Sequence, residues 1–343
     1  MKVYNNFSAA RRLKRLPAAK AGPVLTWGVF DGVHRGHQTL INSVIQWAKK
    51  TGSDSLVITF NNHPERVLNI HNDPLFITSL QHRLVLLEKL GVDAVLVLDF
   101  TRRLSRLPAE DFVNRMIKTL NPSGVVMTDN ISFGRNRSGN IRTLKEILSA
   151  HKIPLKVIRT LKYKNRAIPS SVGITARNSL RSNGQIISSS LIRQAIKEGD
   201  LTTAEKMLGR PVAILGTVVH GEGRGRKLGF PTANLDPHHE ILPLRGVYIA
   251  RAFCQKHCRD FSTPFRALVN VGVKPTFHPR LKHPMEDIEV FLLGYDARKH
   301  GPLYGKDILV EIIRRLRDER RFPSSQALVS QIRKDLDAAK KYR

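Results

Sequence analysis

The stretch V-L-T-W-G-V-F-D-G-V-H-R-G-H-Q-T-L-I-N-S-V-I-Q-W-A-K-K, Val24–Lys50, places an apolar run, a glycine-rich turn and an amphipathic segment in immediate succession. Val24–Phe30 predicts a buried strand, and the apolar positions of Gly36–Lys50 fall on one face of a predicted helix. This alternation continues as far as Leu161 and predicts a parallel, doubly wound α/β sheet. Further strands are predicted at Leu56–Phe60, Ala94–Leu98, Gly124–Met127 and Leu155–Leu161, and further helices at Leu80–Leu90, Ala109–Leu120 and Ile141–Ala150.

The pattern changes after the helix-like stretch Ser189–Leu208. Short apolar runs then follow one another, separated by loops with Gly and Pro and without helices, which is typical of an antiparallel β-barrel or sandwich. The last segment, Ser325–Arg343, returns to helical spacing. We place the boundary near Gly209, so that residues 1–208 and 209–343 form two domains. Barrel strands are predicted at Ala213–Val219, Val247–Phe253, Ala267–Val271, Ile288–Leu293 and Ile308–Ile313.

The charge of the chain is strongly positive, because 57 Lys and Arg residues stand against 28 Asp and Glu, a formal net charge of +29. Such a balance attracts polyanions. The basic residues are spread along the chain, and the aromatic share of 6% leaves little material for base stacking. We therefore expect weak, non-specific polyanion binding and no specific nucleic-acid partner.

The location of the chain is suggested by its apolar runs and its thiols. No apolar run approaches the roughly 20 residues of a membrane-spanning helix, so no membrane association is expected. The two cysteines, Cys254 and Cys258, are too few for a structural zinc site even with His257 between them. Free thiols in a reducing cytoplasm are the better interpretation. The sequence leaves a homo-oligomer open.

The turn G-V-F-D-G-V-H-R-G-H, Gly28–His37, suits chemistry on a nucleotide. Small residues let the backbone approach phosphates, and a helix N-terminus offers free N–H groups with a partial positive charge. His34 and His37 can face one anion there and stabilise charge that develops on an α-phosphate. A glycine-rich turn with two solvent-exposed histidines explains this motif alone equally well.

A second segment, I-S-S-S-L-I-R at Ile187–Arg193, opens another helix with three hydroxyls and an arginine one turn on. Hydroxyls at a helix N-terminus are also ordinary caps. Combined with H-x-G-H in an α/β domain, however, the segment resembles the second signature of the nucleotidyltransferase superfamily, which grips the triphosphate.

Four stretches resemble the prokaryotic bifunctional riboflavin kinase/FAD synthetase family in its own order: Thr26–Leu40, Thr59–Leu68, Ser132–Asn140 and Ile187–Asp200. The resemblance implies a Rossmann-like nucleotidyltransferase domain in which FMN attacks the α-phosphate of ATP, giving FAD and pyrophosphate. It also implies the site: Gly28, Phe30, Asp31, His34 and His37 hold ATP, Ser188, Ser189, Ser190 and Arg193 bind its phosphates, and His63 and Asn130 lie where flavin and nucleotide meet.

Three positions depart from that family. Asn61 and Asn62 stand where an acidic residue and Pro are common, and Ile131 stands where an aromatic residue is usual. A kinase with a degenerate first domain therefore remains an alternative. A nucleic-acid-binding protein that kept only the fold is another, suggested by the charge.

The second half opens with G-T-V-V-H-G-E-G-R-G-R-K-L-G-F-P-T-A-N-L, Gly216–Leu235. Its loop interleaves glycines with cations and can wrap phosphate with backbone N–H groups. A flexible hairpin loop on a basic protein is the plainer interpretation until Pro231–Asn234, P-T-A-N, is considered.

The motif P-T-A-N after a glycine-rich loop resembles the corresponding motif of riboflavin kinases. Further matching stretches are Leu244–Tyr248, Asn270–Phe277, Ile288–Leu293, Leu303–Lys306 and Arg315–Phe322. The resemblance implies a riboflavin-kinase-like antiparallel β-barrel with a C-terminal helix. Gly221, Lys227 and Gly229 would then contact substrate, and the hard oxygens of Thr232 and Asn234 would hold Mg²⁺ with ATP.

Glu289 is expected to be the base that takes the proton of the ribityl 5′-hydroxyl. A lone Glu among strand hydrophobics more often just faces water; its position in the family pattern decides for catalysis. The expected reactions are riboflavin plus ATP to FMN in the second domain, then FMN plus ATP to FAD in the first.

Overall fold

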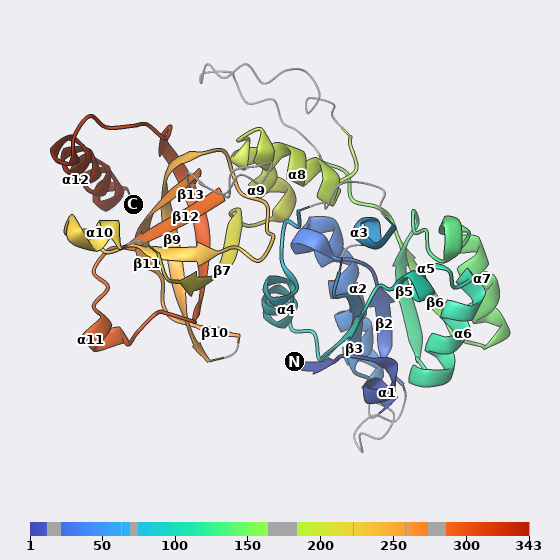
Figure 1. The fold of residues 1–343 in the computed structure, drawn as a ribbon. Coiled ribbons are helices and arrows are strands. Elements are labelled where there is room, and N and C mark those ends of the chain that lie inside the picture. The colour runs from blue at the N-terminus through green and yellow to red at the C-terminus, as the bar shows by residue number, and fades with distance from the viewer. Residues whose placement is uncertain are drawn as a thin grey trace. The chain divides into compact units, whose positions relative to one another are not determined.

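The computed structural model describes residues 1–11, 22–62, 64–68, 75–163, 184–221, 223–257, 259–273 and 286–342. The chain divides into two compact units, one of Met1–Phe76 with Leu80–Leu191 and one of Ile77–Ser79 with Ile192–Arg343 (Figure 1). This division falls inside helix α8 (Ser189–Lys197). The domain boundary near Gly209 stays a prediction.

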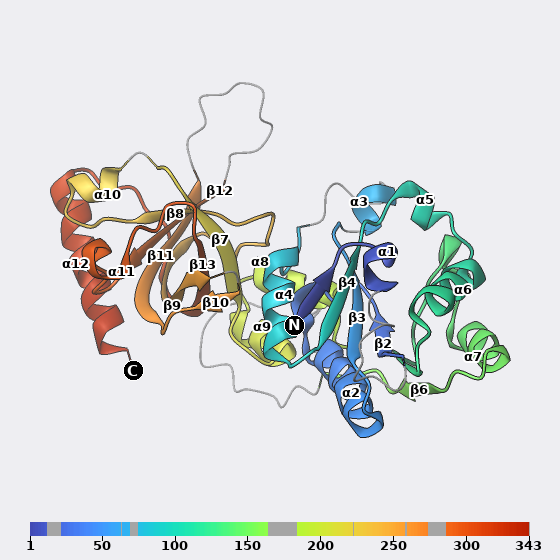
Figure 2. The ribbon, with the colours of Figure 1, turned by 90° about the horizontal axis from the view of Figure 1, so that it is seen from below.

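The first unit is built on a six-stranded sheet in the order β1-β4-β3-β2-β5-β6, and all its pairings are parallel. Helices lie on both faces, with α2 and α4 on one and α6 and α7 on the other (Figures 1 and 2). The predicted doubly wound α/β sheet is confirmed. Its strands are β1 (Lys2–Tyr4), β2 (Val24–Trp27), β3 (Ser55–Phe60), β4 (Ala94–Leu98), β5 (Gly124–Thr128) and β6 (Leu155–Ile158). Its helical elements are α1 (Phe7–Ala10), η2 (Asp31–Val33), α2 (Arg35–Thr51), α3 (Pro64–Leu68), α4 (Leu80–Lys89), α5 (Arg102–Ser105), α6 (Ala109–Leu120), η3 (Arg135–Arg137), α7 (Ile141–Ala150) and part of α8.

The strand order reverses direction between β2 and β5. The chain runs from β2 to β3 and β4 on one side of the sheet, and then returns to β5 and β6 on the other. In open parallel sheets, the crevice at the carboxyl ends of the strands beside such a reversal is where ligands bind. The turn that begins at Gly28 follows β2, and Asn130 follows β5, so the topology brings two predicted site segments to this crevice.

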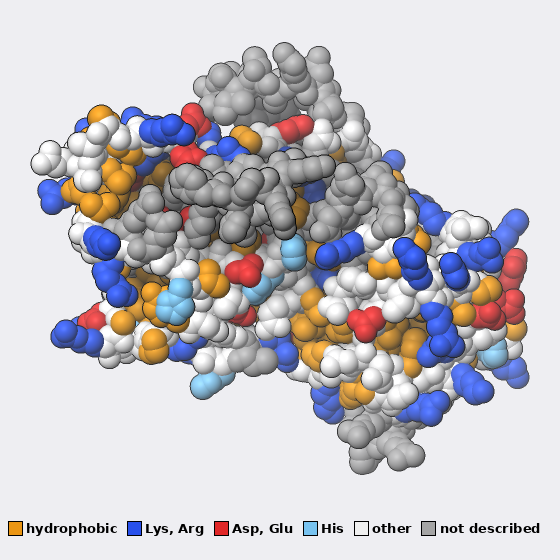
Figure 3. Space-filling model, viewed as in Figure 1, with side chains coloured by type: hydrophobic (Ala, Val, Ile, Leu, Met, Phe, Trp, Pro, Cys, Tyr) orange, Lys and Arg blue, Asp and Glu red, His pale blue; other side chains and the backbone are white. Residues whose placement is uncertain are grey.

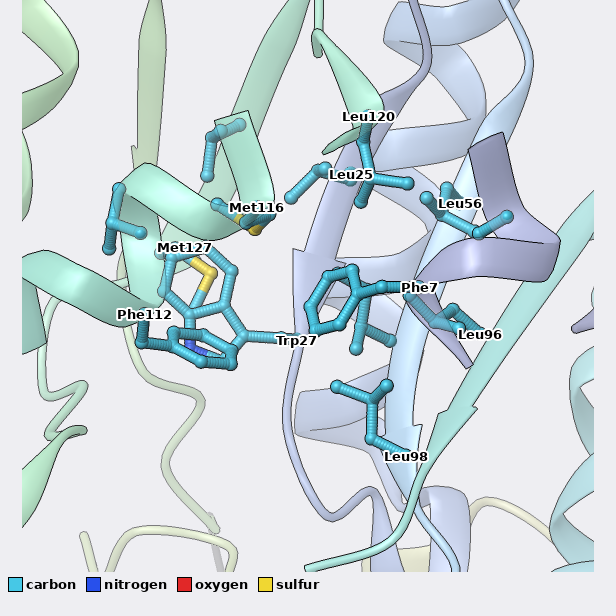
Figure 4. Close-up of a cluster of buried hydrophobic side chains, with 14 of the residues drawn as sticks. Phe7, Leu25, Trp27, Leu56, Leu96, Leu98, Phe112, Met116, Leu120 and Met127 are labelled. Atoms are coloured by element: carbon cyan, nitrogen blue, oxygen red, sulfur yellow. The ribbon is translucent and has the colours of Figure 1, made fainter. Parts of the chain in front are cut away.

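Alternating strand residues supply an apolar core on each face of the sheet. On one face Trp27 packs edge-on against Phe112, with ring centroids 5.9 Å apart, next to Met116 from the same helix (Figure 4). On the other face Ile41 and Val44 of α2 pack with residues of the neighbouring strands. Burial on both faces explains why the central strands β2, β3, β4 and β5 are mostly apolar.

The second unit is an antiparallel barrel. Six strands follow the order β9-β11-β12-β8-β7-β13, and the pairing of β9 with β13 closes the ring. The predicted barrel with a C-terminal helix is confirmed. Its elements after α8 are α9 (Leu201–Leu208), β7 (Ala213–Val219), α10 (Arg224–Lys227), β8 (Ala233–Asp236), β9 (Gly246–His257), β10 (Asp260–Phe261), β11 (Phe265–Val273), β12 (Glu286–Leu292), α11 (Ala297–His300), β13 (Asp307–Arg317) and α12 (Ser325–Lys341).

Helix α12 covers the outside of the barrel at β11. Its Leu336 and Ala339 are buried against Val247, Ile249 and Leu268, whose side chains point away from the barrel interior. The buried carboxylate of Asp335 accepts hydrogen bonds from Arg317 Nε at 3.0 Å and Nη2 at 2.8 Å. A charge-assisted pair of this kind fixes the helix in one position on the strands.

Several sequence expectations need correction. The stretch Ser189–Leu208 is two helices, because Gly199 takes a φ of +78° and Asp200 caps α9 by accepting from Thr203 N at 3.0 Å. The loops of the barrel, expected to lack helices, contain the one-turn helices α10 and α11. Strand β6 ends at Ile158 and is a partly exposed edge strand rather than a buried one.

Candidate active sites

The turn after β2 holds two non-glycine residues in the left-handed region of backbone space, Phe30 with φ +53° and Val33 with φ +39°. Such conformations are unusual, above all for a β-branched residue, and they persist where surrounding structure imposes them. A side chain on Gly28 would begin 3.3 Å from the Phe30 ring, so glycine lets this ring fold back over the strand end. Phe30 and Asp31 are both buried.

His34 is the N-cap of α2. Its Nδ1 accepts a hydrogen bond from the backbone N–H of His37 at 3.3 Å, so the proton of the neutral ring lies on Nε2. The two imidazole rings stack with centroids 3.5 Å apart, and the Phe30 ring meets His37 edge-on at 5.2 Å. The sequence motif therefore forms one packed unit of three rings at a helix N-terminus.

His37 is held in its neutral form. Burial, and then the nearby His34 and Arg83, lower its pKa well below the ordinary value of 6.5. Its Nδ1 is buried and has no hydrogen-bond partner among the described residues. The ring can thus offer one polar N–H at neutral pH without carrying a charge of its own.

The hydroxyl-rich segment reaches this turn from far along the chain. Ser189 Oγ donates to the backbone oxygen of Asp31 at 2.9 Å, across a separation of 158 residues. Ser188 Oγ accepts from Leu191 N at 3.3 Å, so it caps α8. Ser190 is exposed, and Arg193 lies one turn farther along the same helix. The structure brings together the two signature segments that the sequence singled out.

The three departures from the family pattern have structural partners. Asn62 Oδ1 accepts from Phe100 N at 2.8 Å and its Nδ2 donates to Phe100 O at 3.0 Å, which joins the ends of β3 and β4. Asn61 Nδ2 donates to Asp99 Oδ1 at 3.1 Å. Ile131 packs against the core. These amides join the carboxyl ends of β3 and β4, at positions where the family commonly has an acidic residue and Pro.

Two further predicted residues stand apart from these contacts. Asn130 is exposed at the end of β5. His63 lies outside the described residues. Sequence reasoning also missed Arg83, a fully buried arginine on α4, although a cation in the middle of an apolar helical segment was a visible signal.

In the barrel, Glu289 lies between two amides on neighbouring strands. It pairs in register with Asn234 of β8 on one side and Asn270 of β11 on the other. Its sequence neighbours Ile288 and Val290 point into the barrel core, so the Glu289 side chain points outward. Directly opposed residues on one face lie close enough to interact. A carboxylate between two amides forms a polar row on this face.

The glycine-rich loop folds over the end of that row. A side chain on Gly221 would begin 2.1 Å from Asn234 Nδ2, and one on Gly225 would begin 2.9 Å from Thr232 Oγ1. Only residues without a Cβ allow the loop to approach these two side chains so closely. Gly229, with φ +84°, completes the loop, and Lys227 is exposed on α10.

Thr232 and Asn234 suit a divalent cation. Asn234 lies in β8 and Thr232 stands immediately before this strand, and the glycine-rich loop approaches both side chains. Their oxygens are hard ligands of the kind that Mg²⁺ accepts while it keeps waters and phosphate oxygens. Beside the loop, a groove of about 710 Å³ runs between α10 and α12, with Lys227, Ser330 and Arg333 in its lining.

The surface and the helices bear on the other sequence expectations. Lys and Arg side chains are scattered over the face shown in Figure 3 rather than gathered in one block. Within the described ranges, no helix has both the length and the apolar character needed to cross a membrane.

Comparisons with known proteins cover nearly the whole chain. A sequence model of the FAD synthetase family matches residues 16–172, and one of the riboflavin kinase family matches residues 208–343. A bifunctional riboflavin kinase/FMN adenylyltransferase from Buchnera aphidicola is 33% identical over 97% of both chains. The Bacillus subtilis protein of the same description is 32% identical over 94% of this chain and 93% of its own.

A solved structure of a macrolide-efflux protein from Streptococcus pneumoniae is similar over 100% of both chains, with a TM-score of 0.76 and 26% identity. The FAD synthetase model matches the part of the chain that contains the histidine turn, and the riboflavin kinase model matches the part that contains Glu289. The chain belongs to the family of bifunctional riboflavin kinase/FMN adenylyltransferases.

Proposed function

We propose that this chain makes FAD from riboflavin in two ATP-dependent steps, each assigned to its own site. The barrel transfers the γ-phosphoryl group of ATP to riboflavin and gives FMN. The α/β unit then joins FMN to the adenylyl group of a second ATP and releases pyrophosphate. The observation that carries the assignment of adenylyl transfer to the α/β unit is the hydrogen bond from Ser189 to Asp31, which joins the hydroxyl segment to the histidine turn.

In the adenylyl transfer, the phosphate of FMN attacks the α-phosphorus of ATP. A new P–O bond forms while the bond from the α-phosphorus to the bridging oxygen breaks, and pyrophosphate leaves with that oxygen. The Nε2–H of His34, the His37 ring and the N-terminus of α2 are donors for the charge that develops on the phosphate oxygens. Ser189, Ser190 and Arg193 would hold the departing pyrophosphate.

This step needs no general base, because the phosphate of FMN is already ionised at neutral pH. The neutral state of His37 fits that requirement. A neutral imidazole donates a hydrogen bond to the phosphate oxygens. Because its pKa is lowered, the ring does not take up a proton itself at neutral pH. The role of the turn is therefore to position ATP and to stabilise charge.

In the kinase step, Glu289 accepts the proton of the riboflavin 5′-hydroxyl as that oxygen attacks the γ-phosphorus. The bond from the γ-phosphorus to the bridging oxygen breaks, and ADP leaves with that oxygen. Thr232 and Asn234 would hold the Mg²⁺ that accompanies ATP, and the ion would neutralise part of the phosphate charge. The loop through Gly221 approaches Asn234 closely enough for its backbone to enclose the same phosphates.

A kinase without adenylyltransferase activity is the main rival. The amide contacts of Asn61 and Asn62 speak against a degenerate first unit, because they order the strand ends beside the site. A cytoplasmic location and weak non-specific polyanion binding are further expectations from the sequence, which leaves the oligomeric state open.

The test is a time course with the purified full-length protein, riboflavin and excess Mg-ATP, with the flavins separated by chromatography. FMN is expected to rise first and FAD to follow. FMN that accumulates without FAD would favour the kinase-only rival, and no phosphorylated flavin at all would overturn the proposal.

A further inference from the structure

Arg83 carries a permanent positive charge into the core of the first unit. Its side chain is 0% exposed and heads the fully buried side chains by volume. Burying a guanidinium is costly unless hydrogen bonds compensate, so a buried arginine marks a place where its donors are needed. Arg83 lies on α4, and this helix packs against η2, the short helix of the histidine turn.

The guanidinium joins the carboxyl ends of two strands. Nη1 donates to the backbone oxygen of Val29 at 2.6 Å and to Thr59 Oγ1 at 3.0 Å, while Nη2 donates to the backbone oxygen of Phe60 at 3.0 Å. The parallel pairing of β2 with β3 ends at Trp27 and Ile58. Arg83 therefore links the ends of β2 and β3 just beyond the last residue pair of these two strands.

Val29 is the last residue before the strained part of the turn. Phe30, the next residue, has a φ of +53°, and its ring meets the His37 ring at 5.2 Å. Thr59 Oγ1 also donates to the Val29 oxygen, at 3.0 Å. Two donors thus fix the carbonyl from which the turn departs, and the position of the Phe30 ring transmits that constraint to His37.

We propose that Arg83 is a positioning residue for adenylyl transfer: by joining Val29 to Phe60 it holds the turn from Phe30 to His37 in the shape that receives the ATP phosphates. The inference rests on the proposed function of this turn. It assigns no contact between Arg83 and substrate.

The charge of Arg83 has a second effect on the same ring. His34 from the turn and Arg83 from α4 are the charged or titratable groups that lower the pKa of His37, in addition to burial. Removing the cation should raise the His37 pKa toward its ordinary value, while replacing it by another cation should not. A side chain with only a packing role would not produce this difference.

The experiment compares Arg83→Lys with Arg83→Met in the full chain. Lysine keeps a charge but cannot span two carbonyls with a rigid fork, and methionine removes both the charge and the fork. We expect kcat for FAD formation from FMN to fall about 10- to 100-fold in both, because small displacements of positioned groups cost this much. The KM for FMN should change by less than about threefold.

Histidine NMR titration supplies a readout, the pKa of His37, that a general loss of stability would not change. The His37 pKa should rise in Arg83→Met and stay depressed in Arg83→Lys. Arg115→Met is the matched control. Arg83 lies over the Phe76 ring at 5.2 Å and Arg115 lies over the Phe7 ring at 5.1 Å, but Arg115 is on the exposed surface of α6. FAD formation should be unchanged in this control.

A third variant, Thr59→Val, covers the case in which neither Arg83 variant folds. It removes one donor to Val29 without altering any charge, and we expect a several-fold loss of kcat. Suppose that the wild-type protein makes FAD. If the Arg83→Lys variant folds and keeps full kcat, the positioning role is wrong while the proposed function stands. If neither Arg83 variant folds, full kcat in Thr59→Val leads to the same conclusion. If the wild-type protein makes no FAD from FMN, both fall together.

Discussion

Changing Glu289 to Gln should separate the two active sites of this chain. Glutamine keeps the size of the side chain and its place between Asn234 and Asn270, but it cannot accept the proton of the riboflavin hydroxyl. Loss of a general base typically costs ~10²–10⁴ in rate. Each tenfold loss corresponds to about 1.36 kcal/mol of activation free energy, so the expected range is about 2.7–5.4 kcal/mol.

The adenylyl transfer gives this prediction an internal reference. Its nucleophile is an ionised phosphate, so FAD formation from supplied FMN should continue at nearly the wild-type rate in Glu289→Gln. Asp287→Asn is a matched control, because Asp287 lies on the same face of β12 two positions away, opposite Gly272 rather than the two amides. This control should keep kinase activity within a few-fold.

Initial rates of FMN formation from riboflavin and of FAD formation from FMN, measured on the same preparations, decide the matter. Kinase activity of Glu289→Gln within a few-fold of wild type would show that the carboxylate is only a strand residue. A parallel loss of both activities in a folded protein would show instead that the two sites are coupled.

Two other predictions concern phosphate and polyanion binding. Replacing Ser189 and Arg193 together by Ala should stop FAD formation while FMN still accumulates, because the grip on the triphosphate is lost; FAD made by this variant at the wild-type rate would refute the assignment. The net charge of +29 should give weak binding to DNA and RNA of any sequence that falls at least about tenfold between 50 and 200 mM salt, as measured by fluorescence anisotropy. Tight binding that survives high salt, or that prefers one sequence, would favour a nucleic-acid function.

The regular elements of the fold follow from local patterns. The strand that begins at Val24 and the helix that follows the turn could be predicted from apolar periodicity and the glycines. The predicted end at Phe30 was wrong, because β2 ends at Trp27 and Phe30 takes a φ of +53°. Strand β8 was missed because it has four residues and only part of it is apolar, and its role as a barrel strand depends on pairing with β7 and β12. Short β1 and α1 were missed for the same reason, since their partners β4 and α6 lie far along the chain.

The candidate sites divide in the same way. H-x-G-H and P-T-A-N are contiguous, so the sequence displays them directly. The contact of Ser189 with Asp31 joins residues far apart in the chain, and only the family resemblance suggested it. Arg83 went unnoticed because its partners are mainly backbone oxygens, which leave no mark in the sequence of the segments that provide them.

The central claim is that one chain catalyses attack on two different phosphorus atoms of ATP at two sites, with riboflavin as the nucleophile at one and FMN at the other. Parallel reactions with riboflavin and either γ-³²P-ATP or α-³²P-ATP test this directly, with FMN, FAD and pyrophosphate separated. The account predicts that the γ label enters FMN and is retained in FAD, whereas the α label enters FAD alone and leaves FMN unlabelled. The account would be contradicted if the α label never entered a flavin, or if FMN formed without the γ label.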